Sequence, residues 1–145
     1  MSFQFTLEKV LEVKDFEKSD AELAYTEAVK NFEDVATKLY NLLKRKEELI
    51  AANEKKLEKG LTISVIQLNE KTIAYLQKEI DRLQSNTQDA RKKMNEKERY
   101  LTYKSIDLRK YEKMKEIKQQ QYTENEKRTE QKFLDEVSVQ QFVRR

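Results

Sequence analysis

One glycine and no proline interrupt this sequence of 145 residues. Glycine and proline are the residues that most often mark turns and helix ends, so their scarcity leaves two long stretches able to remain helical. The glycine is Gly60, which lies a little before the middle of the chain. We therefore expect two long helices that meet near residue 60.

The composition favours a narrow apolar seam over a compact core. Charged residues make up 39% of the chain and hydrophobic residues 37%, while the net charge is only +3. A chain this polar cannot surround an ordinary globular interior, but it can build long helices or a coiled coil if its apolar residues follow a heptad.

Several classes of chemistry are excluded by missing residue types. The sequence has no cysteine and no histidine, which removes disulfides, thiolate or imidazole metal sites and imidazole catalysis. One glycine cannot build a phosphate-binding P-loop. The acids are scattered among lysines, as on a solvated helix surface. We expect no catalytic residue, no cofactor and no metal, hence no enzyme.

Membrane insertion is not expected either. No apolar run approaches the roughly 18 residues that a spanning helix needs, and the first residues show no basic region followed by an apolar one. The interpretation is a soluble cytoplasmic protein.

Two heptad series support a coiled coil. The first runs from Tyr25 to Leu49 and the second from Ile66 to Tyr111, each with apolar residues spaced alternately by three and four. The first series is widened at the adjoining heptad position, so its helix could bury a broader stripe or receive a third element. The widening residues are Val29, Leu43, Ile50 and Leu57.

The segment around Gly60 has the features of a helix stop and restart. Lysines 55, 56 and 59 suit a helix C-terminus, Gly60 can adopt the left-handed cap, and Ser64 with Gln67 resembles a capping box. A short loop favours antiparallel neighbours. The predicted fold is an all-α antiparallel hairpin over residues 1–145, with helices at about 6–59 and 64–140, a turn at about 60–63 and a second helix that overhangs. Residues 119–145 are candidates for flexibility.

The two heptads predict a register in which facing residue numbers total 122. Leu39 then faces Leu83, and Leu42 faces Ile80. Charge agrees, because residues 1–34 hold nine acids and four lysines, whereas residues 91–118 hold eleven bases and five acids. This register has weak layers, in which Lys18 faces Lys104, Lys14 faces Leu108 and Lys46 faces Leu76. The end far from the turn is therefore expected to be looser than the middle.

The last residues leave two interpretations open. After the polar stretch at 119–132 come scattered apolar residues that no part of the hairpin can cover. They are either a disordered terminus or a segment that folds on a partner. They are Phe133, Leu134, Val137, Val139, Phe142 and Val143.

Five short patterns are spread along the whole chain. Phe3-x-Phe5-x-Leu7-x-x-Val10-Leu11 lies near the start, and Lys59-Gly60-Leu61 lies at the expected turn. The other three are Tyr75-Leu76-x-x-x-Ile80, Leu108-x-x-Tyr111-Glu112-x-Met114 and Leu134-Asp135-Glu136. Together these patterns resemble the FliJ family of flagellar export proteins, and the N-terminal pattern is most similar to the form found in Gram-positive bacteria.

The resemblance implies a non-enzymatic coupling or chaperone-like component of the flagellar type III export apparatus. Its implied partners are the export ATPase FliI, the export gate FlhA and export chaperones, and these would recruit it to the cytoplasmic face of the membrane at the flagellar base. The chain is expected to be a monomer when free. Its expected ATPase-binding residues are Leu11, Tyr111, Met114, Leu134, Asp135 and Glu136; its expected gate-binding residues are Leu42, Leu49, Leu76 and Leu83.

Two other functions remain open on the sequence alone. The broad stripe on the first helix could drive self-association into a purely structural assembly. The basic stretch at 91–118, with interleaved tyrosines, could bind nucleic acid, although the acidic N-terminal stretch is able to neutralise it.

Overall fold

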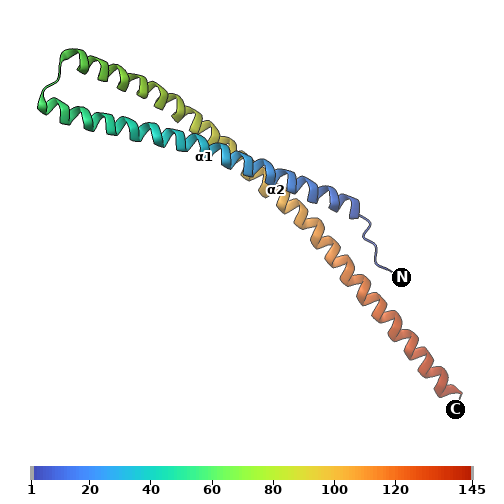
Figure 1. Ribbon diagram of the computed structural model, residues 1–145. Helices are drawn as coiled ribbons and strands as arrows, with labels where there is room; N and C mark the ends of the chain where they lie inside the picture. Colours follow the sequence, from blue (N-terminus) through green and yellow to red (C-terminus); the bar gives the residue numbers. More distant parts are fainter. Residues whose placement is uncertain (1, 145) are drawn as a thin grey trace. The chain divides into compact units, whose positions relative to one another are not determined.

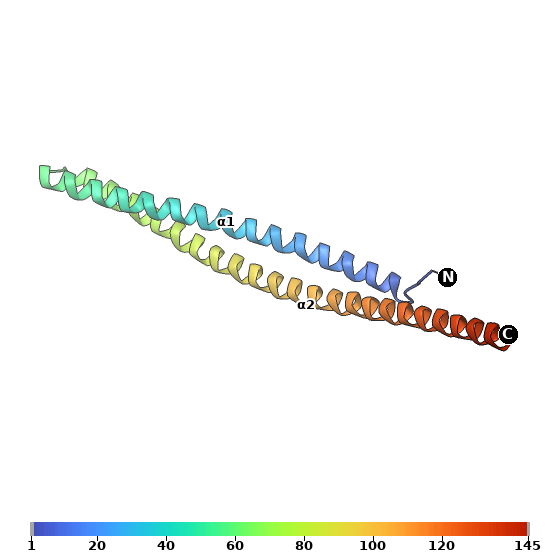
Figure 2. The same ribbon diagram turned by 90° about the horizontal axis from the view of Figure 1, so that it is seen from below.

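The computed structural model describes residues 2–144 and contains two long helices. Helix α1 spans Glu8–Lys59 and helix α2 spans Ile63–Val143, and no strand occurs within the described range. Figures 1 and 2 both show the two helices packed side by side, running in opposite directions from the turn between them. The predicted antiparallel helical hairpin is confirmed, with α2 the longer helix at 81 residues against 52.

The chain divides into two compact units. Unit 1 combines the residues up to Asp20 with those from Thr102 onward, and unit 2 is the turn-containing hairpin Ala21–Leu101. Each unit contains one segment of α1 and one of α2.

The turn in unit 2 depends on the backbone of Gly60. Its φ of 85° lies in the left-handed region, and its N–H donates to the carbonyl of Leu57 at 3.2 Å. A residue with a side chain would be strained at this φ even though a Cβ would meet no atom within 4 Å. The predicted left-handed cap is therefore confirmed.

The start of α2 differs from the sequence prediction. Thr62, rather than Ser64, caps the helix: its hydroxyl accepts the Val65 N–H at 3.4 Å, and its carbonyl accepts the Ile66 N–H at 3.2 Å. The proposed capping box of Ser64 and Gln67 was wrong because α2 already begins at Ile63, which puts Ser64 inside the first turn.

The core of unit 2 is a single narrow seam. Ile80 is 1% exposed and is the largest fully buried side chain, as expected of a heptad position in the seam. The Thr87 hydroxyl is satisfied inside the seam by donating to the Leu83 carbonyl at 2.6 Å. The other buried residues of this unit are Ala21, Ala28, Leu76 and Leu83.

Contacts between the helices give the register in each unit. In unit 2, Lys46 donates to Gln77, a pair whose numbers total 123. In unit 1, the ion pairs Lys14–Asp107 and Glu17–Lys104 both total 121. These polar contacts lie beside the seam, within one residue of the predicted total of 122.

Unit 1 is closed by the residues that precede α1. The Phe3 and Tyr122 rings lie 5.6 Å apart between centroids, and the Glu8 N–H donates to the Phe5 carbonyl at 3.1 Å. The N-terminal segment thereby extends the pairing along α2 as far as Tyr122. Beyond that residue α2 continues as a helix to Val143.

Replacing Gly60 tests the turn. We expect Gly60→Ala to lower the free energy of unfolding by about 1 kcal/mol, because alanine is strained at a positive φ. Gly60→Asn is the matched control. Because asparagine tolerates the left-handed region, this variant should lose less of the free energy of unfolding than Gly60→Ala does. Urea unfolding followed by circular dichroism measures both, and an alanine variant as stable as the parent would contradict the prediction.

Candidate interaction surfaces

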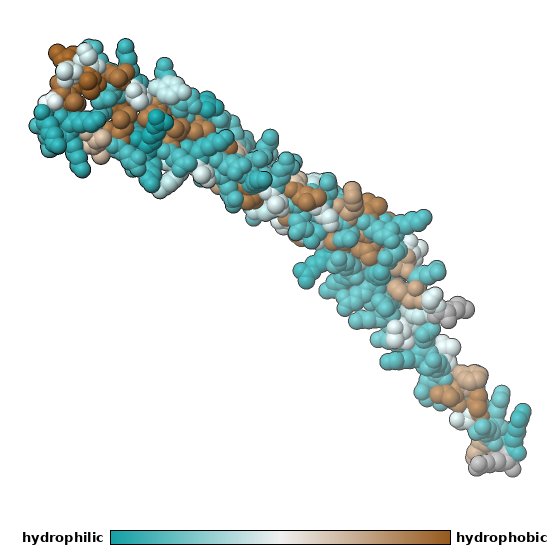
Figure 3. All heavy atoms as spheres, viewed as in Figure 1, coloured by the Kyte–Doolittle hydropathy of each residue, from teal (hydrophilic) through white to brown (hydrophobic). Residues whose placement is uncertain are grey.

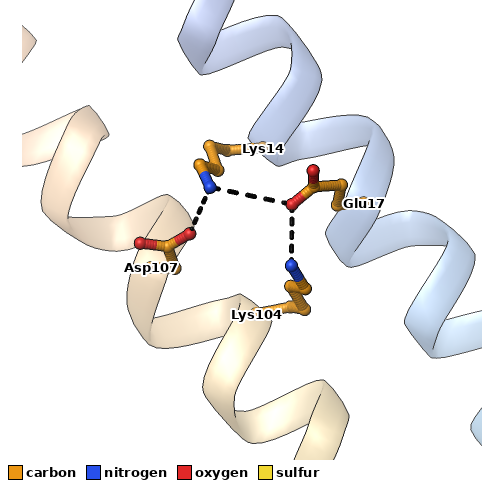
Figure 4. Close-up of polar contacts among 4 residues, drawn as sticks. All are labelled: Lys14, Glu17, Lys104 and Asp107. Atoms are coloured by element: carbon orange, nitrogen blue, oxygen red, sulfur yellow. Dashed lines mark hydrogen bonds and ion pairs between the residues drawn. The ribbon is translucent and has the colours of Figure 1, made fainter.

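Four charged residues join the helices of unit 1 in one cluster. Lys14 pairs with Asp107 at 2.8 Å, Lys104 pairs with Glu17 at 2.9 Å, and Lys14 also lies 3.8 Å from Glu17 (Figure 4). Two pairs cross between α1 and α2, and the Lys14–Glu17 contact links them along α1. The cluster holds the acidic start of α1 against the basic segment of α2.

The cluster shifts the pKa of three of its members. Hydrogen bonding to Lys14 lowers the pKa of Asp107, and hydrogen bonding to Lys104 lowers the pKa of Glu17. The Asp107 carboxylate in turn raises the pKa of Lys14. Each shift favours the charged form of its group, so the cluster is fully ionised at neutral pH.

The seam lysines find partners that the sequence analysis did not foresee. Lys14 and Lys104 were expected to loosen the end far from the turn, yet their long stems reach carboxylates at the side of the seam. Lys115 and Glu8 add another ion pair at 2.9 Å. The expected weak layers are therefore bridged by charge.

The residues expected to bind the ATPase fall into two groups on unit 1. Leu11 and Tyr111 are half-buried, and Met114 follows with 41% of its surface exposed. Leu134 and Glu136 are exposed, and Asp135 accepts a hydrogen bond from Gln131 at 3.2 Å. At ~1.5 Å per helical residue, Tyr111 and Leu134 are separated by about 35 Å along α2.

The last turns of α2 carry large exposed side chains. Phe133 is 64% exposed and Phe142 is 80% exposed, and brown spheres mark this part of α2 in Figure 3. An apolar helix surface of this kind is unusual without a partner. Leu134, Val139 and Val143 are exposed with them.

The residues expected to bind the gate lie in the seam of unit 2. Leu76 and Leu83 are 3% and 7% exposed, whereas Leu42 and Leu49 are half-buried at the edge of the seam. The fold thus brings all four leucines to one stretch of the hairpin. Only the latter two keep surface for a partner.

Four further exposed apolar residues were not predicted as interaction residues, because they lie outside the seam positions. Phe16 and Leu23 on α1 are 72% and 71% exposed, and Ile63 and Leu68 near the start of α2 are 75% and 63% exposed. The sequence does indicate their exposure, because an apolar residue that does not follow the heptad spacing of the seam has no place in it.

Within residues 2–144, no group of three or more acids could hold a metal ion, and no helix is long and apolar enough to cross a membrane.

Comparison with known proteins gives matches along the whole chain. Residues 3–145 match the family described as Flagellar FliJ protein. The flagellar FliJ protein of Bacillus subtilis (strain 168) is 34% identical over 143 residues, which cover 99% of this chain and 97% of that protein. A solved structure of a YscO homolog, CT670 of Chlamydia trachomatis, has the same fold with a TM-score of 0.64 at 21% identity, covering 94% of this chain and 93% of that one.

Acidification tests the charged cluster. Because hydrogen bonds to Lys104 and Lys14 lower the pKa values of Glu17 and Asp107 in the folded chain, their contribution to stability is present at neutral pH and is lost as pH falls through the folded-state values. Asp107→Asn should therefore lower the melting temperature at pH 7 but not at pH 2. Thermal unfolding by circular dichroism measures this, with Asp89→Asn, an exposed position in unit 2, as the control. A melting difference that persists unchanged at pH 2 would contradict the role of the cluster.

Proposed function

The chain belongs to the FliJ family of flagellar proteins, and from this premise we propose that it is a non-enzymatic component of the flagellar type III export apparatus. The match along the whole chain carries this proposal. The proposed partners are the export ATPase FliI, the export gate FlhA and export chaperones, which would bring it to the cytoplasmic face of the membrane. Hydrolysis of ATP would belong to FliI, and this chain would supply contacts.

The exposed end of α2 supports a partner role for unit 1. Leu134 sits among large apolar side chains that no part of the described chain covers, while the N-terminal segment reaches only to Tyr122. Burying such side chains against another protein is favourable, at about 25 cal/mol per Å² of apolar surface. We assign this end to the ATPase, with Leu134, Asp135 and Glu136 as outer contacts and Leu11, Tyr111 and Met114 as inner ones.

The ionic cluster of Lys14, Glu17, Lys104 and Asp107 would position the end of α2 for this contact. It fixes the start of α1 on α2, and the residues before α1 extend this pairing to Tyr122, beyond which α2 continues as a single helix. A continuous helix with a fixed base can present the side chains at its tip in one orientation. The chain would then contribute a preorganised helix to the complex, which lowers the entropy lost on binding.

A charge placed in the apolar tip tests the ATPase contact. We expect Leu134→Asp to weaken binding to the cognate FliI at least tenfold, equivalent to about 1.4 kcal/mol, because it puts a carboxylate into an apolar contact. Leu23→Asp is the matched control, since that leucine is 71% exposed on unit 2. ATP hydrolysis by FliI and co-elution are the measurements. A parent chain that neither binds nor stimulates FliI would refute the partner, and equal effects of the two variants would refute the site.

Truncation of the seam edge tests the gate contact in unit 2. We propose that FlhA binds beside Leu42 and Leu49, with the buried Leu76 and Leu83 supporting them from within the seam. Leu49→Ala should then weaken binding to the cytoplasmic part of FlhA by about tenfold, a loss typical of a contact residue at the centre of an interface. Leu39→Ala controls for the loss of a half-buried seam leucine. Equal binding by parent and Leu49→Ala would place the gate contact elsewhere.

A further inference from the structure

Helix α1 carries a second row of apolar residues outside the seam. Its members stand seven residues apart, a spacing that keeps a row on one side of a coiled-coil helix. Within this row Leu43 is 37% exposed, Ile50 is 36% exposed and Leu57 is 52% exposed. We call the row the outer stripe; it consists of Val29, Ala36, Leu43, Ile50 and Leu57.

The outer stripe forms one wall of a groove in unit 2. Near the turn, a groove of about 220 Å³ lies between Ile50 and Leu57 on one side and Leu61, Ile66 and Ile73 on the other. Figure 3 shows brown spheres gathered at this turn end of the hairpin. The aliphatic side chains come from both helices and from the turn, and Asn53 and Asn69 lie among them in the lining. A row of aliphatic knobs from another helix could pack between these walls.

Acidic residues border this groove on both helices. Glu54 lines it from α1 and Glu70 from α2, and Glu47 precedes Ile50 by one helical turn. Farther along, Asp81 accepts a hydrogen bond from Gln77, and the nearby Lys46 ammonium donates to the same Gln77. The lining of the groove itself therefore holds two carboxylates and no basic residue, while Lys46 lies farther along the helices.

A second groove of unit 2 has a different character. It is lined by three lysines together with three acids and small residues. These lysines are Lys92, Lys93 and Lys97. Of the two grooves, the one beside the turn combines aliphatic walls with carboxylates and no basic residue.

We propose that the outer-stripe groove binds one amphipathic α-helix of a partner protein, with leucine or isoleucine facing the stripe and lysine or arginine on both flanks. The aliphatic walls require an apolar face on the ligand, and Glu54 and Glu70 on opposite walls select basic flanks. The site differs from the four leucines assigned to the gate and does not depend on the export role.

Two other occupants fit the charges less well. A second copy of this chain pairing stripe to stripe would bring the acids beside Ile50 and Leu57 against their own counterparts. An anionic lipid surface would be repelled by the same carboxylates. A helix with basic flanks would instead be attracted by these carboxylates.

A designed peptide tests the groove with the full chain. The probe is a labelled helical peptide about three heptads long, with leucine on one face and lysine on the flanks. A comparison peptide has the same leucines but glutamate on the flanks. Fluorescence anisotropy should show that the lysine peptide binds and that the glutamate peptide binds at least tenfold more weakly. Ile50→Lys should weaken binding of the lysine peptide at least tenfold, and added salt should weaken it further.

The control variant is Asn86→Lys, which adds the same charge at an exposed residue of the second groove and should leave binding unchanged. If circular dichroism shows that Ile50→Lys has lost helix, Leu43→Lys replaces it. The proposal would be overturned if Ile50→Lys and Asn86→Lys weakened binding of the lysine peptide equally, or if the parent chain did not bind it at about 1 mM peptide. Self-association of the chain, or binding to phosphatidylglycerol vesicles, that Ile50→Lys abolishes would overturn it in favour of those occupants.

Discussion

The narrowness of the seam between two helices governs the rest of this structure. Two helices cannot enclose an interior, so few side chains, such as Ile80 and Leu76, become almost wholly buried. Most apolar residues remain half-buried or exposed, and stability has to come from a long series of thin layers. The same geometry leaves apolar side chains beside the seam, which makes the flanks of the hairpin available to other proteins.

Charge compensates where the seam is weakest. In unit 1, Lys14 and Lys104 occupy seam positions that an apolar residue would fill better, yet each reaches a carboxylate of the opposite helix. Exposed pairs contribute little individually, but an acidic segment facing a basic one strongly selects the antiparallel arrangement. The ion pairs and the Phe3–Tyr122 contact together determine where paired helix gives way to single helix.

The proposed functions all use surfaces that are not buried in the seam between the two helices. The tip of α2 offers large apolar side chains, the seam edge offers Leu42 and Leu49, and the outer stripe offers an acidic groove. These surfaces lie on different parts of two units, so one chain could contact several proteins. Each surface is also distinct enough in charge and shape that single substitutions can separate them.

Sequence alone determined the two helices, the break at Gly60 and the register, because helical periodicity and the conformational freedom of glycine are properties of the chain itself. It misplaced the cap, since Ser64 and Thr62 are chemically equivalent candidates and only the path of the turn chooses between them. It also could not show that the seam lysines are paired with carboxylates of the opposite helix. Those outcomes depend on how far side chains reach across two helices, a distance that exists only once both are in place.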